Sequence, residues 1–321
     1  MVAKPSTATD ELSVEDTDAP GAKRPSSLPP ASLIICSRNR PQMLAETVES
    51  VLQGDQVPAE FVIIDQSDAP HLTLSTRATE RDCEIRYIWS RTVGLSRARN
   101  LGVEHARHDI VAFIDDDMFV PADWFSSLIH SLVSNGSDAI VTGRVLPAAS
   151  EGTEQGYAPA LLVSEHRAVY RGRDRNTVLA GGHMATYRST LLKVGGFDVL
   201  LGAGAPFPSA DDMDLGFRLL EAGCQIIYDP DVVLYHRAWR EAGDFLRVRW
   251  NYGIGRGAFY AKHLSIHDRF VLRRMLFDIS IHFIGLPRKL VHDRVRGYGD
   301  ATLVIGILFG GVKWLVMQRS T

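Results

Sequence analysis

The sequence predicts an α/β fold in which crossover helices flank a mostly parallel sheet. Three observations predict it: short apolar runs alternate with helical patterns, two successive runs end in aspartates, and an acidic triplet follows a fully apolar run. Buried parallel strands are apolar on both faces, and strand–helix alternation implies parallel pairing. We therefore expect a ligand at the edge of the sheet where the strands end.

The alternation begins after residue 30. Apolar runs predict strands at residues 32–36, 61–64, 85–89 and 110–114. Helical periodicity predicts helices at 43–53 and at 95–106, the second entered through Gly94. Farther along the chain, the pattern predicts a helix from 211 to 221 and short strands at 226–228 and 232–235.

Three carboxylates, Asp115, Asp116 and Asp117, directly follow the strand at 110–114. Side chains at alternate positions of an extended chain project to the same side, so Asp115 and Asp117 can converge on one cation. Carboxylate oxygens suit Mg²⁺ or Mn²⁺, and these ions bind substrate phosphates. For the triplet alone, a solvated acidic loop is the alternative interpretation.

A nucleotide fits this edge of the sheet. Asp65 ends the neighbouring strand and can accept hydrogen bonds from a base or ribose, and Arg99 can contact a diphosphate. The sequence contains no P-loop motif and no Gly-x-Gly-x-x-Gly after the first strand, which excludes two common nucleotide-binding patterns. Val120 stands where an EF-hand loop requires glycine. For Asp65, a helix-capping or turn role stays open, and for Arg99 a surface position.

A second constellation lies in the middle of the chain. Residues 179–185 are apolar and glycine-rich, which suits close approach of the backbone to a ligand, and the loop at 201–208 has the composition of a lid. Asp211, Asp212 and Asp214 occupy a helix start, where the helix dipole alone would favour them. His236 follows the last predicted strand, as a ligand or as a packed residue.

Composition limits the class of protein. The chain has 321 residues and a net charge of −3, which does not suggest a nucleic-acid partner. Three scattered cysteines form neither a disulfide framework nor a metal-ligand spacing, which fits a reducing compartment. Residues 1–30 contain no aromatic residue and no secretory core segment, and they are predicted to be a disordered leader.

These features together resemble the family 2 glycosyltransferases, inverting enzymes with a GT-A fold that use nucleotide-sugar donors. The resemblance covers about residues 31–240, with every motif in family order. The segments that carry it are Ser32-Leu-Ile-Ile-Cys-Ser-Arg-Asn-Arg40, Val62-Ile-Ile-Asp-Gln-Ser-Asp68, Gly94-Leu-Ser-Arg-Ala-Arg-Asn-Leu-Gly102, Phe113-Ile-Asp-Asp-Asp117, Gly195-Gly-Phe-Asp198, Asp211-Asp-Met-Asp-Leu-Gly-Phe-Arg218 and His236.

The resemblance implies a role for each matching residue. For donor binding, the matching residues are Asp65 at the nucleoside, Arg99 and Asn100 near the diphosphate, and Asp115. For the metal, Mn²⁺ or Mg²⁺, they are Asp115, Asp117 and His236. The general base falls on Asp212. The family often has Glu where this chain has Asp211, so the choice between Asp211 and Asp212 stays open.

The implied activity is that of a nucleotide-sugar-dependent glycosyltransferase of the hexosyltransferase type. It would move a sugar, with UDP as the favoured nucleotide, to a hydroxyl of a glycan or lipid-linked acceptor in cell-surface polysaccharide or glycolipid synthesis. A Gln-x-x-Arg-Trp motif of processive synthases is missing, since Arg247-Val-Arg-Trp250 lacks the glutamine, which favours limited addition.

Residues 241–321 are expected to form a helical extension beyond the GT-A domain at 31–240. Residues 269–296 are strongly basic, and residues 301–317 are apolar apart from Thr302 and Lys313. Such a run next to basic residues and Trp314 fits an interfacial membrane anchor as well as a core helix. We expect a cytoplasmic protein, with peripheral contact to the inner face of the cell membrane as the hypothesis to test.

Two other classes of protein remain open. A sugar-nucleotide nucleotidyltransferase also uses aspartates and a metal on an α/β sheet, but it has no need of the block from Asp211 to His236. A non-catalytic sugar-nucleotide binding module would keep Asp65 and Asp115 but would not require Asp212.

Overall fold

A computed structural model describes residues 28–150, 160–174, 178–238, 240–265 and 267–319. The leader predicted at residues 1–30 lies almost wholly outside these ranges.

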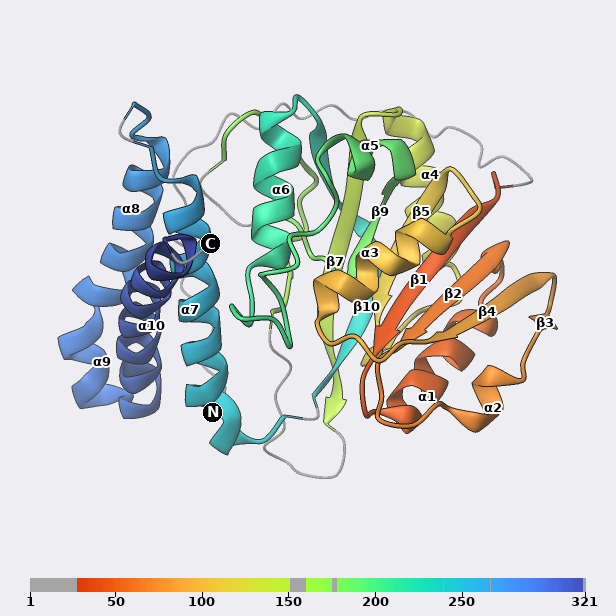
Figure 1. Cartoon of the computed structure of the whole chain (residues 1–321), viewed down its shortest axis with the longest axis horizontal. Helices are drawn as coiled ribbons and strands as arrows, with labels where there is room; N and C mark the ends of the chain where they lie inside the picture. Colours follow the sequence, from red (N-terminus) through yellow and green to blue (C-terminus); the bar gives the residue numbers. More distant parts are fainter. Residues whose placement is uncertain (1–27, 151–159, 175–177, 239, 266, 320–321) are drawn as a thin grey trace.

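A single mixed sheet forms the centre of the described structure (Figure 1). Its strands are β1 (Ala31–Ser37), β2 (Glu60–Asp65), β3 (Thr79–Glu80), β4 (Cys83–Trp89), β5 (Ile110–Asp115), β6 (Met118–Phe119), β7 (Ala139–Ser150), β8 (Ala168–Arg171), β9 (His183–Tyr187) and β10 (Gln225–Ala238). Their order is β3-β4-β2-β1-β5-β9-β7-β10-β6, with β8 paired to β10.

Six of the helices in the described structure lie between strands along the chain, and four follow β10. They are α1 (Pro41–Leu52), α2 (Leu72–Ser75), α3 (Leu95–His105), α4 (Trp124–Asn135), α5 (Arg188–Lys193), α6 (Asp211–Glu221), α7 (Phe245–His263), α8 (Phe270–Ile284), α9 (Leu286–His292) and α10 (Arg294–Gln318), with a short 3-10 turn at Ala242–Asp244. The predicted α/β class, with its flanking and C-terminal helices, is confirmed.

The sheet contains two parallel groups. β4, β2, β1 and β5 run parallel, and so do β7 and β10, but β9 is inserted antiparallel between the two groups. The two short strands expected at 226–228 and 232–235 are one strand, β10. Its pairing with β7 is irregular between Asp229 and Val233, around Pro230, which cannot donate a backbone hydrogen bond.

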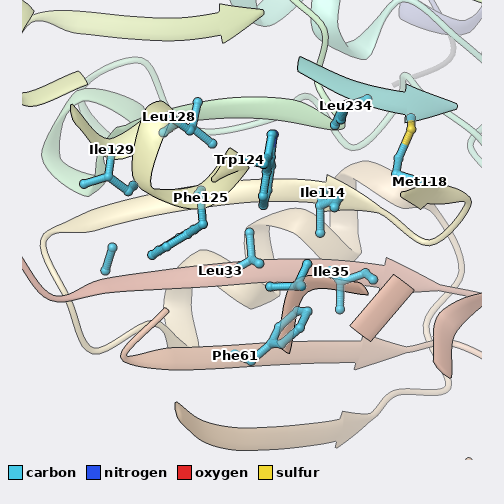
Figure 2. Close-up of a cluster of buried hydrophobic side chains, with 14 of the residues drawn as sticks. Leu33, Ile35, Phe61, Ile114, Met118, Trp124, Phe125, Leu128, Ile129 and Leu234 are labelled. Carbon is cyan, nitrogen blue, oxygen red and sulfur yellow. The ribbon is translucent and has the colours of Figure 1, made fainter. Parts of the chain in front are cut away.

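The alternation of side chains along the strands divides the core into two layers. Leu33 and Ile35 of β1 face α1 and α4, whereas Ile34 and Cys36 face α3, α5 and α6. Figure 2 shows the first layer, in which Trp124 and its neighbours on α4 pack over β1 and β5. Each such fully buried side chain contributes about 2 kcal/mol of hydrophobic free energy. The packing holds the strand ends in fixed positions.

The C-terminal helices stand at one side of the molecule, and α6 lies between them and the sheet (Figure 1). α7 and α10 approach so closely that a Cβ on Gly257 would lie 2.0 Å from the carbonyl oxygen of Ile307. A Cβ on Gly310 would likewise lie 2.1 Å from that of Ile254. Only glycine fits at these two positions, because no side chain tolerates such contacts with backbone atoms.

Asp214 connects α6 to α7 through buried charges. Its side chain is inaccessible to solvent and accepts from Arg218 Nε at 2.8 Å, while Lys262 Nζ lies 2.7 Å away and His263 Nε2 also 2.7 Å away. Burial opposes its ionisation, but the hydrogen bond from His263 and the cations of Arg218 and Lys262 outweigh burial and lower the pKa of Asp214 to about 2. The C-terminal helices are therefore attached to the helix that carries Asp211 and Asp212.

We expect Asp214→Asn to lower the free energy of unfolding by about 2 kcal/mol, because it removes a fully buried carboxylate that three half-buried basic side chains share. Urea unfolding at pH 7 measures the change. The loss should shrink as pH falls through about 2, where the native carboxyl itself becomes protonated. Glu165→Gln, which removes an exposed ion pair with Arg144, is the matched control and should change little. Equal stability of the Asp214→Asn variant and the wild type would contradict the assignment.

Candidate active site

A cleft of about 610 Å³ opens where β1 and β5 end. Its other walls are the 180–183 segment, the 203–212 segment that leads into α6, and one face of α7. Six of the residues predicted from the sequence line it: Arg99, Asp115, Asp117, Asp211, Asp212 and His236. The end of β5 and the start of α6 therefore border the same cleft.

Arg99 joins the two acidic segments. It is buried on α3, and its Nη2 donates to Asp115 Oδ1 at 2.8 Å while its Nη1 donates to Asp211 Oδ2 at 2.7 Å. Its guanidinium carbon lies 5.2 Å from the centroid of the Phe197 ring. Arg99 thus holds a carboxylate from β5 and another from α6 at fixed positions, which replaces the surface position considered for it.

Asp211 and Asp212 begin α6 after a left-handed residue. Ala210 has φ +68°, an uncommon conformation for a residue with a side chain, and conformations of this kind concentrate at functional sites. Burial, followed by repulsion from the Asp211 carboxylate, raises the pKa of Asp212 to about 7. Asp212 Oδ1 accepts from the Met213 N–H at 2.7 Å. A carboxylate with such a pKa can accept a proton near neutral pH.

Gly182 allows the backbone of the 180–183 segment to approach the end of β5 closely. A Cβ at this position would lie 2.0 Å from Asp115 Oδ2, so any side chain would collide with that carboxylate. The glycine-rich run was predicted to allow close approach of a ligand, which stays a prediction, and in this structure the atoms that approach Gly182 are those of Asp115.

Asp116 and Asp117 are both paired with Arg40. Arg40 Nη2 lies 2.8 Å from Asp116 Oδ1, and Arg40 Nη1 lies 3.0 Å from Asp117 Oδ2. Asp116 is buried and also accepts from Ser37 Oγ at 2.6 Å. Burial raises the pKa of Asp116 to about 7, although Arg40 opposes the shift. The triplet is not the solvated loop that was its alternative interpretation.

His236 faces Asp117 across the pairing of β10 with β6. Its Nε2 lies 4.0 Å from Asp117 Oδ1, and its Nδ1 lies 2.9 Å from the carbonyl oxygen of Arg237. A carbonyl only accepts hydrogen bonds, so Nδ1 carries a hydrogen, and Nε2 is the ring nitrogen on the side of Asp117. Metal-binding histidines have this arrangement, with the second nitrogen bonded to a carbonyl or carboxylate.

The donor atoms of Asp117 and His236 fit a cation such as Mn²⁺, which accepts both carboxylate and imidazole. Among the residues that the structure describes, however, no three His, Cys, Asp or Glu side chains are gathered as a metal site. Asp115 is the expected third ligand, and it is turned toward Arg99. The full set of Asp115, Asp117 and His236 therefore stays a prediction.

Asp65 and Asn100 do not border the cleft. Asp65 is buried and accepts from Tyr87 Oη at 2.5 Å and from the Ser67 N–H at 2.9 Å. Asn100 bonds both backbone groups of Phe197 at 2.8 Å and so fixes the ring beneath Arg99. Their contacts with a donor stay predictions, but in this structure each has a structural task. Gln66, next to Asp65, borders the cleft instead.

Arg40 and His183 also line the cleft, and neither was predicted from the sequence to have a role in it. Arg40 follows the first strand, as the aspartate triplet follows the strand at 110–114. This pairing of a basic and an acidic strand end was the sequence signal that could have predicted the contact. His183 is fully buried, its Nε2 accepts from Trp124 Nε1 at 3.0 Å, and burial lowers its pKa to about 3. No sequence signal separated this neutral histidine from the glycine-rich run around it.

Comparison with curated proteins gives relatives of about 25% identity. A glucosyl-dolichyl phosphate glucuronosyltransferase of Haloferax volcanii is 25% identical over 222 residues, which are 67% of this chain and 71% of the relative. A pre-mycofactocin glycosyltransferase of Mycobacterium tuberculosis is 25% identical over 72% of this chain, which spans about half (48%) of that relative.

Comparison with solved structures supports the same fold. A mannosyltransferase of Pyrobaculum calidifontis, PcManGT, in complex with GDP-Man and Mn²⁺, matches with a TM-score of 0.61 and 17% identity over 92% of this chain and 91% of that one. TarS 1-349 of S. aureus in complex with UDP-GlcNAc matches with a TM-score of 0.52 and 15% identity over 90% of this chain and 92% of that one.

The model of the family described as glycosyl transferase family 2 matches residues 32–196, just over half of the chain. This segment contains the strands and aspartates on which the resemblance rested. The chain therefore belongs to glycosyl transferase family 2 and is a glycosyltransferase with a GT-A-type fold.

Proposed function

We propose that this protein is an inverting glycosyltransferase that moves a sugar from a nucleoside-diphosphate sugar to an acceptor hydroxyl, with a divalent metal. The observation that carries the proposal is that carboxylates from two elements, Asp115 and Asp117 at the end of β5 and Asp212 at the start of α6, line one cleft. A sugar between them would have a metal-binding group on one side and a base on the other.

Asp212 is the general base in this proposal. It takes the proton of the acceptor hydroxyl while that oxygen forms a bond to the anomeric carbon. The bond from that carbon to the diphosphate breaks on the opposite face, and its electron pair leaves with the β-phosphate, so the anomeric centre inverts. Asp211 is held by Arg99 at 2.7 Å and is therefore less able to accept a proton than Asp212.

Asp115, Asp117 and His236 would hold the metal, which when bound offsets the negative charge that develops on the leaving diphosphate. Mn²⁺ and Mg²⁺ both suit these ligands, and PcManGT, which has the same fold, is a complex with Mn²⁺. UDP is the favoured nucleotide, in agreement with the UDP-GlcNAc complex of TarS 1-349, whereas PcManGT holds GDP-Man. The nucleoside would lie toward Asp65, with Arg99 and Asn100 near the diphosphate.

The acceptor is proposed to be a glycan or a lipid-linked sugar in cell-surface polysaccharide or glycolipid synthesis. α7 forms one wall of the cleft through Val248, Asn251, Tyr252 and Arg256, and its other side packs on α10. α10 is the one helix of the described residues that is long and apolar enough to cross a membrane, and 33% of its apolar window is buried. An acceptor held near α7 would lie next to this helix.

The exposed face of α10 supports peripheral membrane contact on the cytoplasmic side. Apolar side chains recur three and four residues apart along it: Ile305, Leu308, Phe309, Val312, Leu315 and Val316. Residues 264–321 contain nine basic and four acidic residues, although the whole chain is slightly acidic. An apolar stripe among basic side chains fits an interfacial helix on an anionic lipid surface.

We expect Asp212→Asn to fold and bind donor normally but to lower the rate of transfer by about 10² to 10⁴-fold, because the amide cannot accept a proton. Asp211→Asn should cost less if Asp212 is the base. Release of nucleoside diphosphate from a panel of nucleotide sugars with Mn²⁺ measures both. Release of pyrophosphate would indicate a nucleotidyltransferase, and full turnover by both variants would indicate that the base lies elsewhere.

The rate of transfer should also rise with pH. A base whose pKa is raised to about 7 is protonated at lower pH, so kcat/KM should rise with pH to a plateau above about 7. The groups that face Asp212 are Asp211 on the same helix, Arg99 on α3 and Asp115 on β5. Removing the Asp211 charge should move the midpoint of the profile to lower pH. A flat profile from pH 5 to 9 would contradict this assignment.

We expect Asp117→Ala to abolish metal-dependent donor binding, because the remaining side chains offer too few oxygens for a hard cation. Calorimetric titration with UDP, with and without Mn²⁺, measures this. Asp293→Ala, an exposed carboxylate at the start of α10, is the control for general loss of negative charge. Unchanged Mn²⁺-dependent UDP affinity in the Asp117→Ala variant would remove this residue from the metal site.

We expect Leu308→Glu combined with Val312→Glu to release the protein from vesicles that contain anionic lipid, because the charges oppose insertion of the apolar face. Co-sedimentation of the full chain with these vesicles measures binding. Leu72→Glu, at a leucine on α2 that is still more exposed, is the control and should bind like the wild type. If the wild type does not sediment with vesicles, the membrane role of α10 is wrong.

A further inference from the structure

Arg40 lies on a carboxylate that the proposed metal needs. It follows β1, borders the cleft, and bridges Asp116 and Asp117 through separate guanidinium nitrogens at 2.8 and 3.0 Å. The Asp117 side chain is only 7% exposed, so few other directions of approach to it are open. Arg40 therefore fills part of the space around the Asp117 carboxylate and neutralises part of its charge.

An arginine and a divalent cation at one carboxylate oppose each other in two ways. The Nη1–H of Arg40 uses a lone pair of Asp117 Oδ2 that could otherwise bind the ion. Its positive charge also repels a second cation a few ångströms away, and such repulsion is large where water is partly excluded. Metal binding at Asp117 is weakened for as long as Arg40 keeps this position.

Arg40 differs from Arg99 in its freedom to move. Its side chain is 34% exposed, whereas that of Arg99 is 4% exposed and lies against the Phe197 ring. Asp116 keeps the hydrogen bond from Ser37 if Arg40 leaves. A guanidinium that leaves Asp117 within the same cleft would find a phosphate oxygen a good partner, because arginine binds phosphate through paired hydrogen bonds.

We propose that Arg40 competes with the divalent cation for Asp117, and that a nucleoside diphosphate relieves this competition by taking Arg40 onto its phosphates. This inference rests on the proposed function, because it assumes that metal and diphosphate share the cleft. Metal and diphosphate then bind cooperatively, each raising the affinity for the other by the same factor. Part of this gain in affinity comes from the displacement of Arg40, and the rest comes from direct contact between the metal and the phosphates.

The test is the affinity for Mn²⁺ alone, measured on the full chain by titration with electron paramagnetic resonance detection. Arg40→Met should raise this affinity at least about 10-fold, because it removes a cation from Asp117. It should also reduce the factor by which UDP raises Mn²⁺ affinity. Arg38→Met is the matched control, since Arg38 is exposed, borders the same cleft and carries the same charge, and it should change the Mn²⁺ affinity much less.

Arg40→Lys provides a second variant if Arg40→Met fails to fold. A lysine keeps the charge but cannot bridge both carboxylates as a planar fork, so its Mn²⁺ affinity should rise less than in Arg40→Met but remain above the wild type. An affinity for Mn²⁺ that is unchanged or lower in these variants would overturn the proposal. If this happens while the wild type releases nucleoside diphosphate from a nucleotide sugar, only the role of Arg40 is overturned and the proposed function stands.

Discussion

The buried bridge from Asp115 through Arg99 to Asp211 is the interaction on which the site depends. Asp115 ends a central strand, Asp211 begins a helix that follows almost a hundred residues later, and Arg99 holds both within 2.8 Å. A buried guanidinium requires two such partners, since a buried charge without partners costs several kcal/mol. The same constraint fixes Asp212, which comes directly after Asp211, in the wall of the cleft that the aspartate triplet also lines.

Charge balance within the cleft follows from this bridge. Five carboxylates, at residues 115, 116, 117, 211 and 212, share the cleft with five arginines, at residues 38, 40, 99, 240 and 256. Arg40 and Arg99 form the ion pairs described above with four of these carboxylates. Repulsion between neighbouring carboxylates nevertheless adds to burial in raising the pKa of Asp116 and of Asp212. The raised pKa of the proposed base therefore comes from the close approach of acidic groups in a poorly solvated space.

The sequence predicted the parts of the site that depend on strand ends and helix starts. Asp115 and Asp117 line the cleft because they end a central strand, whereas Asp212 reaches the same cleft from the start of α6. The antiparallel β9 was not predicted, because its glycine-rich approach resembled a loop. Nor did the sequence indicate that Asn100 would bond the Phe197 backbone or that Arg40 would bridge the triplet. Those contacts depend on side-chain directions that only the folded packing determines.

α7 links the chemistry to the apolar surface. One side of this helix lines the cleft, and the other meets α10 at glycines so close that their backbones touch. Lys262 and His263 near its end are bonded to Asp214 of α6, the helix that carries the proposed base. α7 is therefore fixed on both sides, and α10 cannot leave it to cross a bilayer without breaking this packing. The proposed membrane contact is therefore one in which α10 lies on the surface, since a span would break this packing.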